Sequence, residues 1–344
     1  MSLVMPLSDS ELLATARRLT QSAGRPDAVT LERLAGGRNN RVFRVATASG
    51  TPLFLKSYFY DPRDPRQRLA AEWRFLTYAW GKGIRRVPEP LAAYWDNHAG
   101  IYEYVTGHKV APGEVSWSHL EAAADFLLAL NAPPRRLEGM PPASEACFSL
   151  AEHVALVDGR VARLASLDPE VPYHDRAEDF VRTQLVPTWA KVRRHIEEQG
   201  PPLGLTARLS DADTIVSPSD FGFHNMLVGD DGRLMFTDFE YAGRDDPAKL
   251  ICDFFCQPEM PAPLDHYERF EAKLMDGLGL APQHKQRCRL LLDAYRIKWT
   301  CIILNDFRSV GAAQRAFAGG DARSERHAAQ LAKAEAKLSE VSRD

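Results

Sequence analysis

The sequence lacks several features that would mark particular classes of protein. No apolar run approaches the roughly 20 residues needed to cross a bilayer, and the first residues lack the basic and then apolar pattern of a signal peptide. There is no basic excess, since the net charge is −3 and the pI is near 6.4. The five cysteines are scattered and form no Cys-x-x-Cys pair that would indicate zinc or a redox centre. These absences predict a cytoplasmic protein with no membrane partner and no nucleic-acid partner.

The 344 residues contain two regions of different patterning, and the apolar content of 45% can supply a core for each. Alternation predicts antiparallel strands within residues 29–58, 91–94 and 100–105, with helices at 9–23 and 67–81. From residue 106 onward helical spacing dominates. The expected helices are 117–131, 149–166, 176–199, 247–257, 264–278 and 284–308, with a terminal helix within 321–344. The sequence therefore predicts an α+β fold with a small N-terminal lobe, residues 1–105, and a larger, mainly helical C-terminal lobe, residues 106–344.

Three polar residues surround a predicted hairpin in the C-terminal region. Asp220 follows a Ser-Pro-Ser run, Asn225 comes five residues later, and Asp238 comes 18 residues after Asp220. The hairpin spans residues 226–236, so Asn225 and Asp238 are expected at one edge of a two-stranded ribbon. Phosphoryl transfer needs a carboxylate that faces the attacking hydroxyl and hard oxygen ligands that keep Mg²⁺ on the phosphates of ATP. Each residue alone would fit an ordinary turn or cap, but together with the hairpin they favour this chemistry.

A lysine and a glutamate in the N-terminal region support the same chemistry. Lys56 ends an otherwise apolar strand, and Glu72 follows 16 residues later on the apolar stripe of the helix at 67–81. A carboxylate in that place needs a cationic partner. The alternatives left open are a lysine that reaches solvent with its ammonium group and a glutamate that tilts out of the core.

These motifs resemble the aminoglycoside phosphotransferase and choline kinase superfamily, whose catalytic loop reads H-G-D-x-x-x-x-N and whose metal-binding Asp follows on the next strand. The resemblance covers roughly residues 30–260 and implies a protein-kinase-like, two-lobed fold. It implies that Asp220 is the catalytic aspartate and that Asn225 and Asp238 bind Mg²⁺. The sequence departs from the pattern at Pro218 and Ser219, where the family usually has His and Gly.

The resemblance also implies a nucleotide site in the N-terminal lobe. Gly37 and Asn40 lie in a segment similar to the hairpin that covers the nucleotide, where small residues let backbone N–H groups approach phosphate. Lys56 is expected to pair with Glu72 and to contact the phosphates of ATP. The segment that contains Glu103 and Val105 looks like the hinge whose backbone groups pair with adenine; taken singly, it reads as an edge strand.

The expected function is transfer of the γ-phosphate of ATP to a hydroxyl of a small molecule. Only some eight residues separate Asp238 from the next predicted helix, which leaves no room for the long segment that holds a protein substrate. Acids and a tryptophan near the site would suit an amino-alcohol or aminoglycoside-like acceptor. The candidate contacts are Glu240, Asp245, Asp246, Trp299, Asn305 and Asp306.

Two other classes of function stay open at this point. A catalytically silent nucleotide-binding module is suggested by Pro218 and Ser219, although such a module has no evident need for Lys56, Glu72 and Asp220 together. A helical scaffold that binds no ATP is the other alternative.

Overall fold

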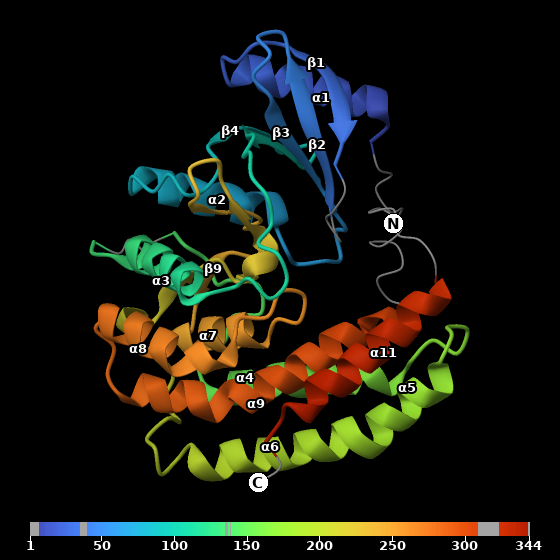
Figure 1. Cartoon of the computed structure of the whole chain (residues 1–344), viewed down its shortest axis with the longest axis vertical. Helices are drawn as coiled ribbons and strands as arrows, with labels where there is room; N and C mark the ends of the chain where they lie inside the picture. The colour runs from blue at the N-terminus through green and yellow to red at the C-terminus, as the bar shows by residue number, and fades with distance from the viewer. Residues whose placement is uncertain (1–6, 35–39, 135–136, 138, 309–322, 343–344) are drawn as a thin grey trace. The chain divides into compact units, whose positions relative to one another are not determined.

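The computed structural model describes residues 7–34, 40–134, 137, 139–308 and 323–342 (Figure 1). By their internal contacts these residues form two compact units. The first unit contains the described residues as far as Val110, together with Asn225–Gly243. The second contains the described residues from Ala111 to His224 and those from Arg244 onward.

The first unit is built on a five-stranded antiparallel sheet, as the sequence predicts. The strand order is β1-β2-β3-β5-β4. The strands are β1 Ala28–Arg33, β2 Asn40–Thr47, β3 Leu53–Tyr58, β4 Pro90–Tyr94 and β5 Ala99–Glu103. Helix α1, Asp9–Ser22, packs against this sheet (Figure 1), and its N-terminus is closed by a capping box in which Ser8 and Glu11 bond to each other's backbone N–H groups.

The alternation of β3 determines which of its side chains meet α1. Leu53 and Leu55 belong to the apolar core that also contains Leu12 and Leu19 of α1. Because successive side chains of a strand point to opposite faces, Lys56 lies on the other face of the sheet. The buried face of helix α2, Arg68–Gly81, includes Glu72 at its centre. The pattern of β3 therefore brings a lysine to the face from which a buried glutamate can reach it.

The second unit is mainly helical, which agrees with the predicted α+β fold, although Asn225–Gly243, expected in the C-terminal lobe, belongs to the first unit. Its helices are α3 Trp117–Asn131, α4 Leu150–Ala162, α5 His174–Phe180, α6 Val186–Gln199, α7 Pro247–Cys256, α8 Tyr267–Gly277, α9 Gln283–Ile303 and α11 Arg323–Ser339. The last of these, α11, lies alongside α9 (Figure 1). No helix in the described part of the chain combines the length and apolarity needed to span a bilayer.

One predicted helix is interrupted. The helix expected at 176–199 is divided into α5 and α6 by a π-helical turn at Val181–Leu185. Pro187 stands in the first turn of α6 and has no backbone N–H to donate. A single π-helical turn of this kind is a known irregularity within an otherwise α-helical segment.

Two short strand pairs hold the segments around the predicted catalytic residues. Strands β7, Met226–Val228, and β8, Leu234–Phe236, form the expected hairpin within the first unit. Strand β6, Ile215–Ser217, pairs with β9, Gly243–Asp245, whose residues Arg244 and Asp245 belong to the second unit. Strand β6 leads directly into the loop that contains Asp220.

Candidate active site

Lys56 and Glu72 form a buried ion pair in the first unit. The Lys56 Nζ lies 2.7 Å from Glu72 Oε2, and the two residues are only 3% and 4% exposed. Glu72 also accepts a hydrogen bond from the hydroxyl of Tyr58 at 2.7 Å and one from the backbone N–H of Phe239 at 3.3 Å. Because both charges are buried and paired, neither side chain is turned to solvent.

Two further carboxylates surround the same ammonium group. The Lys56 Nζ is 2.5 Å from Asp238 Oδ1 and 3.6 Å from Glu240 Oε2. Burial by itself lowers the pKa of a lysine, but the three neighbouring carboxylates outweigh it and raise the pKa of Lys56 well above its ordinary value. Lys56 is therefore a permanent positive charge in a region of excess negative charge.

Asn40 holds Glu240 in place. The Asn40 side-chain amide donates a hydrogen bond to Glu240 Oε2, and its carbonyl oxygen accepts one from the backbone N–H of Phe59 at 3.2 Å. Arg68 Nε lies 4.0 Å from the other oxygen of Glu240. The sequence places Asn40 beside the nucleotide, whereas the structure shows its side chain bonded within the protein. Gly37, the other residue expected there, lies outside the described residues.

Asn225 and Asp238 stand at the same end of the β7–β8 hairpin, as the sequence predicts. Met226 and Phe236 form the last strand pair at that end, and Thr237 closes it by donating two hydrogen bonds to the Asn225 carbonyl, at 2.9 and 3.0 Å. The Asp238 backbone is left-handed, with φ of 67°. An amide oxygen and a carboxylate are hard ligands that fit Mg²⁺, and the Asp238 side chain is 37% exposed.

The backbone beyond Asp238 is held by an aromatic contact. The Phe239 ring stacks on Phe75 of α2, with centroids 4.3 Å apart. Since the Phe239 N–H also bonds to Glu72, the residue after Asp238 is fixed at both its backbone and its side chain. These contacts support the left-handed conformation at Asp238, which is costly for a residue other than glycine.

Asp220 lies in a loop of the second unit. The aromatic residues next to Asp220 pack this loop against two helices. Phe221 packs on Phe126 of α3 and Phe254 of α7, with centroids 6.1 and 5.3 Å apart. Phe223 also packs on Phe254, at 5.4 Å. The Asp220 side chain itself is 34% exposed. The loop is therefore rigidly seated on the helices while its carboxylate reaches solvent.

Ser219, the residue before Asp220, stands where the family usually has glycine, and its backbone adopts a conformation that glycine favours. Ser219 has φ of 68°, and the Asp220 N–H donates across it to the Pro218 carbonyl at 3.1 Å. This left-handed conformation favours glycine, which is the residue the family usually has at this position. The chain therefore keeps a tight turn before the acid although the glycine is replaced by serine.

Glu103 and Val105 lie at the edge of the sheet in the first unit. Glu103 is the last residue of β5, pairs with Leu53, and donates its N–H to the Glu89 carbonyl at 2.9 Å. Val105 follows β5 and is half-buried. The part proposed for these residues in adenine binding stays a prediction.

Comparison with known proteins adds to this geometry. Residues 30–291 match the model of the phosphotransferase enzyme family. The chain belongs to this family. A search for similar curated proteins finds no match. Membership supports small-molecule kinase activity towards a hydroxyl group and gives no support to a silent module.

Solved structures share the fold of this phosphotransferase, which confirms the predicted kinase-like architecture. A spectinomycin phosphotransferase solved with ADP and spectinomycin is 12% identical in sequence. The match covers 97% of this chain and 99% of that protein, with a TM-score of 0.60. A choline kinase from Cryptosporidium parvum is 12% identical, with 97% of each chain covered and a TM-score of 0.57. A choline/ethanolamine kinase family protein from Mesorhizobium loti is 20% identical, covering 94% of this chain and 98% of its own, with a TM-score of 0.53.

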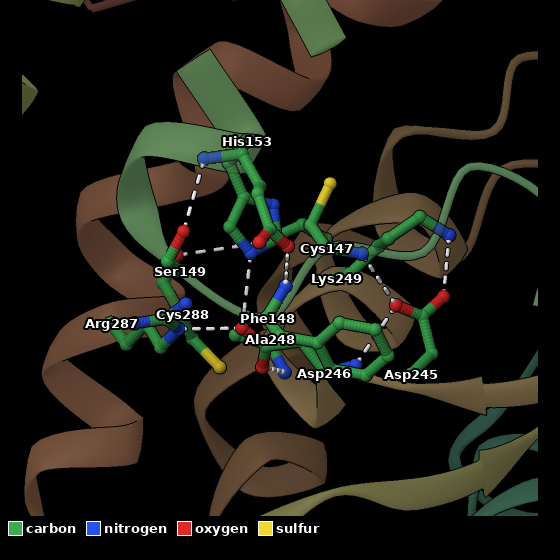
Figure 2. A network of polar contacts seen from close by, with 12 residues as sticks. Cys147, Phe148, Ser149, His153, Asp245, Asp246, Ala248, Lys249, Arg287 and Cys288 are labelled. Atoms are coloured by element: carbon green, nitrogen blue, oxygen red, sulfur yellow. Dashed lines mark hydrogen bonds and ion pairs between the residues drawn. The ribbon is translucent and has the colours of Figure 1, made fainter. Parts of the chain in front are cut away.

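Two of the acids expected to contact the acceptor are instead part of a buried network in the second unit (Figure 2). Asp245 accepts from Lys249 Nζ at 2.8 Å and from the Cys147 N–H at 3.1 Å. Asp246 accepts from Arg287 Nε at 2.5 Å and from the Ala248 N–H at the start of α7. Both acids are completely buried. Their charges are therefore balanced by cations of the same chain, which favours a structural role.

His153 joins the same network from α4. Its ring lies between Asp246 Oδ2, 3.0 Å from Nε2, and the Tyr295 hydroxyl, 2.7 Å from Nδ1. Burial lowers the pKa of His153, while Arg287 and His153 hold the pKa of Asp246 at about 2 despite its burial. The network thus ties α4 and α9 to the first turn of α7.

The remaining candidate acceptor contacts have partners in the second unit, whereas Glu240 belongs to the first. The Trp299 Nε1 donates to Asp253 at 2.9 Å, and Asp253 also accepts from Lys298 at 2.7 and 2.8 Å. Asp306 pairs with Arg326 of α11 at 2.9 and 3.1 Å, and Asn305 accepts from Arg308 at 3.4 Å. The Trp299 ring is half-buried, as are Asn305 and Asp306, and the Lys298 ammonium lies 5.7 Å from the ring centroid.

Replacing Ser219 with glycine should stabilise the protein. Glycine removes the steric penalty of φ 68°, and we expect the free energy of unfolding to rise by about 1 kcal/mol. Urea denaturation measures the change. The control is Ser166→Gly, at a position with φ of −130°, where glycine should give no gain. Equal behaviour of the two variants would contradict a strained turn before Asp220.

Removing the charge of Asp246 should strongly destabilise the second unit. Asp246→Asn leaves the buried Arg287 without its carboxylate, and we expect a loss of about 3–5 kcal/mol. Glu197→Gln, which breaks an exposed pair with Arg193, should cost less than about 1 kcal/mol. Thermal and urea unfolding compare the two. Similar small losses in both would show that the buried network does not hold the helices.

Proposed function

We propose that this phosphotransferase uses ATP and Mg²⁺ and that Asp220 is its catalytic base. The hydroxyl oxygen of the acceptor forms a bond to the γ-phosphorus, the bond from that phosphorus to the bridging oxygen breaks, and ADP leaves. The hydroxyl proton passes to the Asp220 carboxylate. The observation that carries the proposal is the buried ammonium of Lys56, held by Glu72 and Asp238 in a chain of this family.

Each of the other residues has a separate part in the proposal. Lys56 is a fixed positive charge for the phosphates, and Glu72 keeps its side chain in that position. Asn225 and Asp238 offer the oxygen ligands for Mg²⁺, which when bound neutralises charge on the phosphates. The excess of carboxylates around Lys56 supports this assignment, because a divalent cation would offset their mutual repulsion.

For the acceptor we propose a small molecule with a hydroxyl group, and amino alcohols and aminoglycosides are the first to test. Proteins with the same fold are named as choline kinase, ethanolamine kinase and spectinomycin phosphotransferase. The half-buried Trp299 ring is the proposed contact for a cationic acceptor.

Asp220→Asn should abolish most of the turnover. The amide keeps the shape of the side chain but cannot take the proton, so we expect kcat to fall by about 10²–10⁴-fold. ADP release with a panel of acceptors measures it. Asp230→Asn, in the exposed hairpin turn, serves as the control and should leave kcat unchanged. Full activity of Asp220→Asn would remove Asp220 from the mechanism.

Asp238→Asn should remove the magnesium-dependent part of nucleotide binding. In the unchanged protein, Mg-ATP at 100 times its Kd should stabilise the fold by about 2.7 kcal/mol, seen as a rise in Tm over that with ATP and EDTA. The variant should lose this difference, whereas Asp231→Asn should keep it. A magnesium-dependent rise that survives in Asp238→Asn would show that the metal is held elsewhere.

A further inference from the structure

The His224 side chain lies against the carboxylate of Asp220. Its Nε2 is 3.4 Å from Asp220 Oδ1, and the two residues lie four positions apart in the sequence. The His224 side chain is 15% exposed, less than half the exposure of Asp220. The imidazole therefore covers one oxygen of the carboxylate while the acid as a whole stays accessible.

The position of this ring depends on Gly222. A Cβ atom at Gly222 would lie 2.6 Å from His224 Nδ1 and 2.8 Å from Cε1, closer than any ordinary contact. The Gly222 backbone does not adopt a left-handed conformation. Glycine is thus needed at position 222 to make room for the ring of His224, and not to allow the backbone conformation of the turn.

The backbone on both sides of Gly222 is fixed. Phe221 and Phe223 pack on the same ring of α7, Phe254. Phe223 also meets the edge of His119 from α3, with ring centroids 6.4 Å apart. The start of the short 3₁₀ turn Phe223–Asn225 is thereby anchored, and His224 leaves it in a defined direction. The ring of His224 is consequently presented to Asp220 by a rigid support.

We propose that His224 is a positioning residue for Asp220. With its proton on Nε2, the imidazole donates to Asp220 Oδ1 and restricts rotation of the carboxylate, so that Oδ2 faces the acceptor hydroxyl. The 3.4 Å separation is long for a hydrogen bond, and such bonds commonly shorten when substrate binds. This inference rests on the proposed function, because it assigns to Asp220 the part of base.

The substitution at Pro218 agrees with this assignment. The family usually has a histidine two residues before the acid, and proline offers no side-chain donor there. This chain instead has its histidine four residues after the acid, over a glycine that makes room for it. A base that is misplaced by about 1 Å can lose 10²-fold in rate, so an orienting contact has a measurable effect on turnover.

Kinetics of three variants test the proposal. His224→Ala should lower kcat by about 10–100-fold while KM for ATP changes less than about twofold. His224→Gln keeps an N–H donor and should recover part of kcat. Gly222→Ala keeps the imidazole but displaces it, and should lower kcat in the same way. His195→Ala, at an exposed position of α6, is the control and should match the unchanged protein.

The outcomes separate positioning from packing. Equal loss in His224→Ala and His224→Gln would mean that the ring only fills space, and unchanged kcat in His224→Ala or Gly222→Ala would overturn the proposal. Circular dichroism confirms that each variant is folded. If His224→Ala does not fold, the other two variants still decide the question.

Nuclear magnetic resonance tests the contact without turnover. The ¹⁵N resonance of His224 Nε2, assigned by its absence in His224→Gln, should move in Asp220→Asn and stay in Asp230→Asn. An unmoved resonance in Asp220→Asn would disprove the contact. If the unchanged protein phosphorylates no acceptor but the resonance moves, the proposed function fails while the pairing of His224 with Asp220 stands.

Discussion

The burial of one ammonium group determines how the first unit is assembled. Lys56 has almost no exposure to solvent, and a lysine in such a place is stable only if carboxylates surround it. No carboxylate on β3 itself can do this. Glu72 comes from α2, and Asp238 and Glu240 come from a segment more than 180 residues later in the chain. The ion cluster therefore joins the β7–β8 hairpin to the sheet and explains why residues 225–243 belong to the first unit.

Backbone strain occurs next to the acids proposed for the chemistry. Ser219, before the proposed base, and Asp238, a proposed metal ligand, both have left-handed backbones without being glycine. Such conformations persist only where the surrounding structure enforces them. Phe239 on Phe75, and Phe221 and Phe223 on Phe254, supply that enforcement. In both places aromatic packing beside the acid fixes the backbone, while the carboxylate stays about one-third exposed to solvent.

Helix α7 links the buried network of the second unit to the loop of Asp220. Its first turn is held by Asp246, through Arg287 and His153, and its middle is held by Asp253 through Lys298. The next residue, Phe254, packs against Phe221 and Phe223 of the loop. The buried acids thus hold the helix on which the loop of Asp220 rests.

The linear sequence was sufficient for most helices and for the strands of the first unit, but not for β9 or for the π-helical turn that divides α5 from α6. Alternation gave the strands, apolar spacing gave the helices, and a glutamate on an apolar stripe demanded a cation, because each of these depends on neighbours within a few residues. The burial and the partners of the other polar and charged side chains were decided only by tertiary contacts. Asp245 and Asp246 are acids close to Asp238 in the sequence, yet they are fully buried beside Lys249 and Arg287. Asn40 bonds to Glu240, and His224 faces Asp220, only because the folded backbone directs them there. Residue type and spacing report which groups a chain possesses, whereas burial and partners decide which charges are already balanced and which remain for a ligand.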